Sequence, residues 1–205
     1  MSQSEQPVFQ LASGVRLRPW ESQYAQVLVD SSRDPGIQHW NRPGLLSIDD
    51  AQARIARWRR RWEAEEAAVW AIQRVDDDHP VGLIGLGDMD FKGGSAEFLY
   101  WLLPAARGSG AMVDATIRVS RWALDVLGLH RLRITHSVAN TASCRVATRA
   151  GFALEGTMRS ALLHADGWHD EHLHARIQGD AWPDEEHTTT ADLNVSNLRN
   201  RPAAT

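Results

Sequence analysis

The segment best suited to chemistry is a glycine-containing turn at residues 107–112, with the sequence Arg-Gly-Ser-Gly-Ala-Met. It lies between a predicted strand and a predicted helix. Glycines in such a turn let successive backbone N–H groups face outward, and a helix N-terminus adds partial positive charge, so the turn suits an anion such as a pyrophosphate. A tight turn that binds nothing would have the same composition. The turn fits neither a Walker-type loop, which needs a lysine, nor a Rossmann loop, which needs a third glycine.

Two side chains on neighbouring predicted strands could take up a proton. Glu97 lies in the segment 96–103, and partial burial would raise the pKa of its carboxyl group. His136 lies in the segment 130–137, and an imidazole titrates near neutrality. Each residue has a structural alternative: Glu97 as the partner of an arginine, and His136 as a hydrogen-bonded core residue.

Histidines gather around the predicted C-terminal hairpin. We interpret them as hairpin surface or as the lining of a substrate pocket, with metal binding as an alternative. The histidines and the acids near them are His164, His169, His172, His174, Asp166 and Asp170.

Arginines crowd a predicted helix that begins at Ser47 and reaches Trp62, where they are Arg54, Arg57, Arg59, Arg60 and Arg61. Planar guanidinium groups beside tryptophans could hold phosphates or RNA. However, Trp58 and Trp62 fall on the apolar stripe of the helix, and acidic residues follow directly. A solvated face is therefore favoured, and RNA contact is the alternative.

Composition limits the class of protein. The chain has 205 residues and a formal charge of -4, which argues against a general nucleic-acid coat protein. Cys144 is the only cysteine, so neither an intramolecular disulfide nor a zinc cluster of several cysteines can form. Residues 1–6 do not look like a signal peptide, and no apolar run approaches the ~18 residues of a membrane span. We therefore predict a cytoplasmic protein with no membrane partner.

The positive charge is concentrated in one segment. Residues 105–150 hold seven arginines and two aspartates, a local balance of +5 around the glycine turn. Such a basic segment suits a polyanionic cofactor. The arginines are Arg107, Arg118, Arg121, Arg131, Arg133, Arg145 and Arg149.

The order of predicted elements describes a mixed sheet with helices on its faces. Alternating apolar residues predict strands at 15–18, 69–75, 81–89, 96–103, 130–137, 154–164 and 168–177. Helical spacing predicts helices at 21–32, from Ser47, at 110–127 and at 141–150. The helix from Ser47 has a capping-box-like Ser47 and Asp50, and the last two strands form a hairpin around Asp166 and Gly167. For the helix at 110–127 the predicted apolar side is Val113, Ile117, Ser120, Leu124 and Leu127.

The domain prediction has three parts. Residues 1–14 are an N-terminal extension, residues 15–180 are one domain, and residues 181–205 are a polar and flexible tail.

Several segments in order carry a family resemblance. The strand at 96–104 followed by the turn at 107–110 resembles the acetyl-coenzyme A (acetyl-CoA) motif of the GNAT N-acetyltransferases, Arg/Gln-x-x-Gly-x-Gly/Ala. Further segments resemble the branch that contains the RimJ and RimL ribosomal-protein N-acetyltransferases, and these are 17–19, 140–143, 150–152, 155–159 and 166–170. The resemblance covers residues 15–177. It implies the α/β (α+β) GNAT fold: a mixed, mostly antiparallel sheet with one splayed pair of strands and helices on both faces.

The resemblance also implies a mechanism. The pantetheine arm of acetyl-CoA would lie between the strands 96–103 and 130–137, with the pyrophosphate on the backbone amides of residues 108–113. A deprotonated amine would attack the thioester directly, and no metal is needed. Ser143 would give a proton to sulfur, although a helix cap is the alternative for this serine. The implied coenzyme-binding residues are Leu102, Leu103, Arg107, Gly108, Ser109, Gly110, Ala111, Met112, Val113, Asn140 and Ser143.

This chain departs from the motif at Met112, where the family has Gly or Ala. We predict an N-acetyltransferase that moves an acetyl group from acetyl-CoA to a primary amine, either a protein N-terminus or a small molecule. One alternative uses another acyl donor, an acyl-CoA or an aminoacyl-tRNA. The other is a non-catalytic module that binds coenzyme A. A homodimer is compatible with the sequence.

Overall fold

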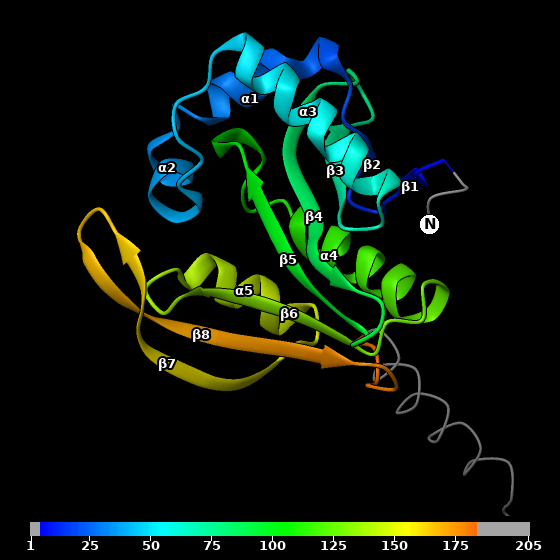
Figure 1. Cartoon of the computed structure of the whole chain (residues 1–205), viewed down its shortest axis with the longest axis vertical. Coiled ribbons are helices and arrows are strands. Elements are labelled where there is room, and N and C mark those ends of the chain that lie inside the picture. The colour runs from blue at the N-terminus through cyan, green and yellow to red at the C-terminus, as the bar shows by residue number, and fades with distance from the viewer. Residues whose placement is uncertain (1–4, 184–205) are drawn as a thin grey trace, which may run out of the picture.

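A single eight-stranded sheet forms the centre of the computed structural model, which describes residues 5–183 (Figure 1). The strand order is β1-β2-β3-β4-β5-β6-β8-β7. Every neighbouring pair is antiparallel except β5 and β6, which are parallel. The strands are β1 (Phe9–Gln10), β2 (Val15–Pro19), β3 (Ala68–Arg74), β4 (Pro80–Asp90), β5 (Ser95–Leu102), β6 (Arg131–Ser137), β7 (Ala153–His164) and β8 (Gly167–Ile177).

Helices cover both faces of this sheet, as the sequence predicted. One apolar cluster joins α1 and α3 to one face through Val69, Ala71 and Leu83. The other cluster joins α4 and α5 to the opposite face, where Trp70 and Ile84 lie. The helices are α1 (Ala25–Ser31), α2 (Pro35–Asn41), α3 (Ile48–Glu63), α4 (Ala111–Arg121), with a π-helical turn at Trp122–Val126, and α5 (Thr141–Arg149).

The parallel strands β5 and β6 separate after a short contact. They are paired only where residues 95–97 face residues 131–133. Beyond Glu97 the two strands diverge, which Figure 1 shows as a widening gap between their ribbons. The predicted splayed pair is therefore confirmed, and among the described strands none pairs with the β6-facing edge of β5 beyond Glu97.

The helix predicted from Ser47 is confirmed together with its cap. The Ser47 Oγ accepts the N–H of Asp50 at 3.1 Å, and the Asp50 carboxylate accepts the N–H of Ser47 at 3.0 Å. Two of the four N–H groups that a helix leaves unpaired are thus satisfied. Ala51, Ile55 and Trp62 are buried beneath this helix.

The predicted buried side of the helix at 110–127 was right in part. Ser120 and Leu124 of that side are buried, and Ile117 and Leu127 pack against the core while only half-buried. The prediction omitted other buried residues of α4, among them Met112, Ala115, Thr116 and Val119. Small side chains let this helix approach the sheet closely, so its buried face does not follow the largest apolar residues.

One helix was missed. Helix α2 begins at Pro35, directly after Asp34, whose carboxylate accepts the N–H of Ile37 at 2.8 Å. Asp followed by Pro is a common start of a helix, because the acid caps the N-terminus and proline fits the first position. The single helix predicted at 21–32 is a short 3₁₀ helix at Ser22–Tyr24 that continues directly into α1, which ends at Ser31.

Both termini of the described chain contact the domain. Phe9, in the predicted N-terminal extension, is 5% exposed and packs against Trp70 and Trp122. Trp182, assigned by sequence to the polar tail, is 9% exposed and lies over Arg176. The rest of the predicted tail, residues 184–205, lies outside the described residues.

Candidate active site

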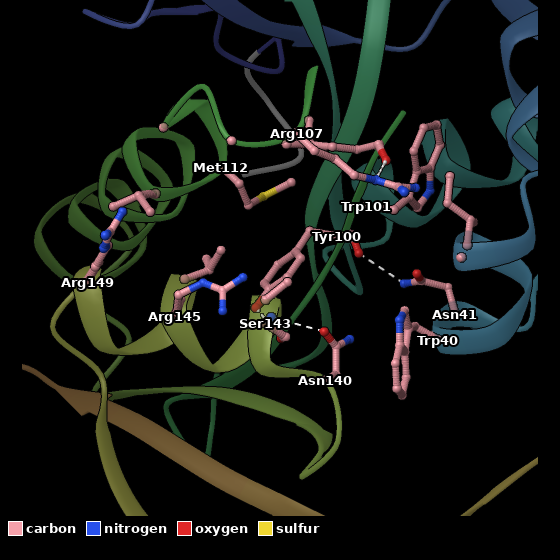
Figure 2. A pocket seen from close by; sticks show the side chains of 18 residues that line it. Trp40, Asn41, Tyr100, Trp101, Arg107, Met112, Asn140, Ser143, Arg145 and Arg149 are labelled. Atoms are coloured by element: carbon pink, nitrogen blue, oxygen red, sulfur yellow. Dashed lines mark hydrogen bonds between the residues drawn. The ribbon is translucent and has the colours of Figure 1, made fainter. Parts of the chain in front are cut away.

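A cavity of about 310 Å³, which we call the first cavity, lies beside the part of β5 that has separated from β6 (Figure 2). Its walls come from α2, β5, the glycine turn, the first turn of α4 and the length of α5. The residues that line it are Gly36, Ile37, Trp40, Asn41, Tyr100, Trp101, Leu102, Arg107, Gly108, Gly110, Met112, Val113, Asn140, Ala142, Ser143, Arg145, Val146 and Arg149.

The glycine turn has the geometry of an anion-binding loop. Gly108 and Gly110 have φ values of 79° and 85°, a region that side-chain-bearing residues rarely adopt. The Ser109 hydroxyl donates to the carbonyl of Ala106 at 2.9 Å, which closes the turn. Gly110 is the N-cap of α4 and lines the cavity with Met112 and Val113, so the N-terminal end of the helix forms part of the cavity wall. The N–H of Ala111 donates to the Ser109 hydroxyl at 3.3 Å.

Only part of the basic segment serves this cavity. Arg107, Arg145 and Arg149 line it, and Figure 2 shows Arg145 and Arg149 on the α5 side. The other four arginines of the segment have different partners, which are Phe9 for Arg118, Trp182 for Arg121, Glu155 for Arg131 and Glu97 for Arg133. The local charge of +5 therefore overstates the positive charge at the cavity itself.

Arg107 ties α2 to the glycine turn. Its Nε donates to the carbonyl of Leu102 at 3.1 Å, and its guanidinium forms an ion pair with Asp34 at 2.8 Å. Burial alone would raise the pKa of Asp34, but hydrogen bonds from the Ile37 N–H and from Arg107 outweigh it and hold this pKa below its usual value. The two interactions fix α2 as one wall of the first cavity.

Helix α2 also reaches the unpaired edge of β5. The side-chain amide of Asn41 donates to the backbone carbonyl of Tyr100 at 3.0 Å, a contact drawn in Figure 2. This carbonyl is available because β6 has already diverged at that point. A ligand that runs along β5 would meet Asn41 here.

Tyr100 and Ser143 meet at the centre of the site. The Tyr100 hydroxyl and the Ser143 Oγ are 2.7 Å apart, and either atom can donate. Burial raises the pKa of Tyr100 to about 12, although the hydrogen bond with Ser143 opposes this rise. Tyr100 therefore stays a protonated phenol at neutral pH.

Ser143 is not the helix cap that the sequence left open. Asn140 is the N-cap of α5, and its side-chain oxygen accepts the N–H of Ser143 at 3.1 Å. The hydroxyl of Ser143 points to Tyr100 instead, as Figure 2 shows. The serine is thus held by its backbone while its hydroxyl remains available for chemistry.

A second cavity of about 240 Å³ lies on the other side of this pair. It shares Trp40, Asn41, Tyr100, Asn140 and Ser143 with the first cavity. Its remaining lining residues are Phe98, Leu99, Thr135, His136, Ser137, Leu162 and Glu171. Glu171 is the only acidic residue, and arginine and lysine are absent, among the described residues that line it.

Most predicted coenzyme-binding residues lie at the first cavity. Those that line it are Leu102, Arg107, Gly108, Gly110, Met112, Val113, Asn140 and Ser143, whereas Leu103, Ser109 and Ala111 do not. Met112 is 5% exposed and belongs to the apolar core, so its side chain forms part of the cavity wall instead of projecting freely into the glycine turn.

The two predicted bases differ in position. Glu97 lines neither cavity: it pairs with Arg133 at 3.2 Å and accepts the hydroxyl of Thr135 at 2.6 Å. This is the ion pair that was its structural alternative, and a catalytic role for Glu97 stays a prediction without geometric support. His136 lines the second cavity, but its ring packs against His172 and His174.

Sequence reasoning missed three residues that the fold brings to the site. Tyr100 lies in the predicted strand 96–103, where alternation places it on the same face as Phe98 and Leu102. Trp40 belongs to the missed helix α2. Glu171 lies in the terminal hairpin, for which the sequence predicted only histidines and aspartates as candidate site residues.

Comparison with known proteins identifies the family. Residues 15–153 match the model described as "Acetyltransferase (GNAT) domain". The chain belongs to the GNAT acetyltransferase family. It is therefore an acyl-CoA-dependent acyltransferase, and its reaction is the transfer of an acetyl group to an amine.

Two curated relatives and one solved structure illustrate the similarity. "Probable N-acetyltransferase YjcK" of Bacillus subtilis is 28% identical over 75% of this chain and 91% of its own length. "Ribosomal-protein-serine acetyltransferase" of Escherichia coli is 32% identical over 49% of this chain and 56% of its own length. The structure of RimL, a ribosomal L7/L12 alpha-N-protein acetyltransferase in complex with coenzyme A, superposes with a TM-score of 0.74 at 20% identity, over 83% of this chain and 98% of that one.

GNAT members of this fold thus bind coenzyme A, and ribosomal-protein acetyltransferases are among the relatives of the chain. Within residues 5–183, none of the helices is both long and apolar enough to cross a membrane.

Proposed function

We propose that the first cavity binds acetyl-CoA and that the second cavity binds the primary amine that receives the acetyl group. The observation that carries this proposal is the shared wall: Tyr100 and Ser143 line both cavities and bond to each other at 2.7 Å. The pyrophosphate occupies the glycine turn, with Arg107, Arg145 and Arg149 around it. The pantetheine arm lies along the unpaired edge of β5.

Glu171 and Tyr100–Ser143 divide the proton transfers between them. Glu171 takes the proton of the incoming ammonium group, and the neutral nitrogen forms a bond to the acetyl carbonyl carbon. The adduct nitrogen then carries one proton more than an amide. When the carbon–sulfur bond breaks, Ser143 gives its proton to the departing sulfur and Tyr100 returns one to Ser143. The surplus proton of the nitrogen restores the Tyr100 hydroxyl through solvent, and Glu171 releases its proton to solvent. A residue that stays protonated at neutral pH suits this second role. The products are an amide and the free thiol of coenzyme A.

The acceptor that the site supports best is the N-terminal amine of a protein. A carboxylate and the indole of Trp40 in one cavity both attract an ammonium group, the first by charge and the second by its π face. Residues of α2 and of the β7–β8 hairpin line the second cavity, namely Trp40 and Asn41 of the helix and Leu162 and Glu171 of the hairpin. The ribosomal-protein relatives support the same acceptor class.

Two measurements test this function. Calorimetry should show that acetyl-CoA binds with micromolar-range affinity. Release of coenzyme thiol should then depend on an amine, and peptides with a free N-terminus should outperform the same peptides blocked by acetylation. Faster turnover with small amines than with any peptide would move the acceptor class to small molecules.

Other outcomes separate the alternatives. Undetectable binding of acetyl-CoA, together with a tRNA gel shift that is lost when Arg57, Arg60 and Arg61 are changed to Glu, would indicate an aminoacyl-tRNA donor. Coenzyme binding without turnover on a broad panel of amines would indicate a non-catalytic module.

A further inference from the structure

Four potential metal ligands converge on the α5 side of the sheet, next to the catalytic pair. They are His136 of β6, Cys144 of α5, and His172 and His174 of β8. One ligand atom from each residue lies within 4.8 Å of all the others. Sequence order grouped His172 and His174 with His164 and His169, whereas the fold groups them with two residues that lie about thirty positions earlier in the chain.

Hydrogen bonds to backbone carbonyls set the orientation of two of these rings. His136 Nδ1 lies 2.8 Å from the carbonyl oxygen of Ser137, and His174 Nδ1 lies 3.4 Å from that of Phe152. A neutral imidazole that donates from Nδ1 keeps a lone pair on Nε2. This is the arrangement by which outer hydrogen bonds orient metal-binding histidines.

Two of the ring nitrogens in this cluster have no hydrogen-bond partner within the described part of the chain. His136 is 6% exposed, and its Nε2 has no hydrogen-bond partner among the residues that the structure describes. The same is true of His172 Nδ1 within residues 5–183. Burying polar atoms without partners is costly, so a native structure that does so usually has a ligand or an ordered group to satisfy them.

The spacing of one pair of ligand atoms is close to that of a metal site. Cys144 Sγ lies 3.9 Å from His174 Nε2. Zinc-ligand bonds of about 2.3 Å to sulfur and 2.1 Å to nitrogen place such a pair about 3.6 Å apart in a tetrahedral site, so this pair needs only a small contraction. Ligand atoms that lie up to 4.8 Å apart must move closer when the ion binds.

We propose that His136, Cys144, His172 and His174 bind one Zn²⁺ ion in a closed tetrahedral site. Nitrogen and sulfur ligands favour zinc over magnesium or calcium, which prefer oxygen. Binding converts the Cys144 thiol to a thiolate and releases one proton to solvent. With four protein ligands the ion has no open position for substrate, so its role is structural.

The site would join α5 to β6 and β8. Cys144 directly follows Ser143, so a metal held by Cys144 would fix the helical turn that presents Ser143 to Tyr100. The role of His136 is then to bind the metal and not to take the proton of the amine. For His172 and His174, the proposal assigns metal binding in place of the expected role as hairpin surface or pocket lining.

Metal binding by the full chain is the direct test. Protein freed of metal by a chelator should take up one equivalent of Zn²⁺ in competition with a chromophoric chelator. Co²⁺ in place of Zn²⁺ should give a thiolate-to-cobalt charge-transfer band and intense visible bands typical of tetrahedral coordination. Failure to bind Zn²⁺, or a Co²⁺ spectrum without the charge-transfer band, would overturn the proposal.

Variants locate the ion. Cys144→Ser should abolish the charge-transfer band, and His174→Gln should weaken Zn²⁺ binding more than about tenfold. His130→Gln removes an exposed histidine at the start of β6 and should change neither result. Unaltered Zn²⁺ affinity in both Cys144→Ser and His174→Gln would place the metal elsewhere, and its loss in His164→Gln would identify the hairpin histidines instead.

A folding readout accompanies these measurements. Zn²⁺ should raise the melting temperature of the wild-type chain and of His130→Gln, because a ligand that binds only the folded state stabilises it. It should leave Cys144→Ser unchanged. Circular dichroism of each metal-free variant shows that it is folded, so loss of binding is not mistaken for loss of structure.

Discussion

The two cavities that meet at Tyr100 and Ser143 differ in charge. The first is lined by three arginines and by the glycine turn, and no acid occurs among the described residues of its lining. The second has Glu171 and His136 and lacks both arginine and lysine among its described lining residues. Opposite fields on either side of one hydrogen-bonded pair suit a polyanionic donor on one side and a cationic acceptor on the other. Under the proposed function, the acetyl group crosses between the cavities at this pair.

A substitution in the wall that both cavities share should reduce kcat more than any other change considered below. Ser143→Ala removes the proposed donor to sulfur, so kcat should fall more than about tenfold, within the range of general acid catalysis. The dissociation constant of acetyl-CoA should stay within a few fold. Steady-state kinetics and calorimetry measure the two quantities.

Thr148→Ala is the matched control for Ser143→Ala, because Thr148 is exposed on the same helix and lines neither cavity. Its kcat should equal that of the wild type. Unchanged turnover in Ser143→Ala would show that the shared wall is structural only.

The positive side of the comparison can be tested by arginines from the same basic segment. Arg145→Gln should raise the dissociation constant of coenzyme A by about tenfold, the cost of one charge-assisted hydrogen bond. Arg118→Gln should leave it nearly unchanged, because Arg118 packs on Phe9 outside the cavity. Equal losses in both variants would mean that the whole basic segment acts through its general field.

The negative side can be tested by two carboxylates. Glu171→Gln should raise the KM of the amine several fold and remove the acidic limb of the pH dependence of kcat/KM, with coenzyme affinity unaltered. Glu97→Gln is the isosteric control, and we expect little change because Glu97 lies outside both cavities. A pH profile that loses its acidic limb only in Glu97→Gln would restore Glu97 as the base.

The smallest expected effect concerns Tyr100 at high pH. Since burial raises its pKa to about 12, the phenol stays protonated as pH rises through about 10, the ordinary value for tyrosine. The kcat should therefore show no basic limb below pH ~9.5. Stopped assays across this range check the point, and a basic limb that disappears in Tyr100→Phe would contradict it.

Local features of the sequence predicted the fold well. The capping box of α3, the glycine turn and the alternating strands each depend on neighbouring residues, so spacing alone revealed them. The buried side of the helix at 110–127 was predicted only in part, because Ala115 and Thr116 are buried by close packing, which their size permits but their hydrophobicity does not indicate. Helix α2 was overlooked, although Asp34 and Pro35 were a readable start signal.

The candidate site was only partly predictable. The glycine turn, Asn140 and Ser143 followed from ordered motifs, and these residues do line the first cavity. Tyr100 and Glu171 were not predicted. Their place in the site depends on how β5 and β8 pack against α5 and α2, and the local sequence pattern does not reveal that packing. The pairing of Glu97 with Arg133 likewise depends on the short contact between β5 and β6.

By itself the sequence determined the family, the order of the elements and the turn that suits a pyrophosphate, because these are properties of short segments. Only the tertiary structure decided which charges share a cavity, which hydroxyl Ser143 meets and which histidines lie beside Cys144. The physical reason is that these relations join residues far apart in the chain, and the packing of α2, α5 and the terminal hairpin around the splayed strands brings them together.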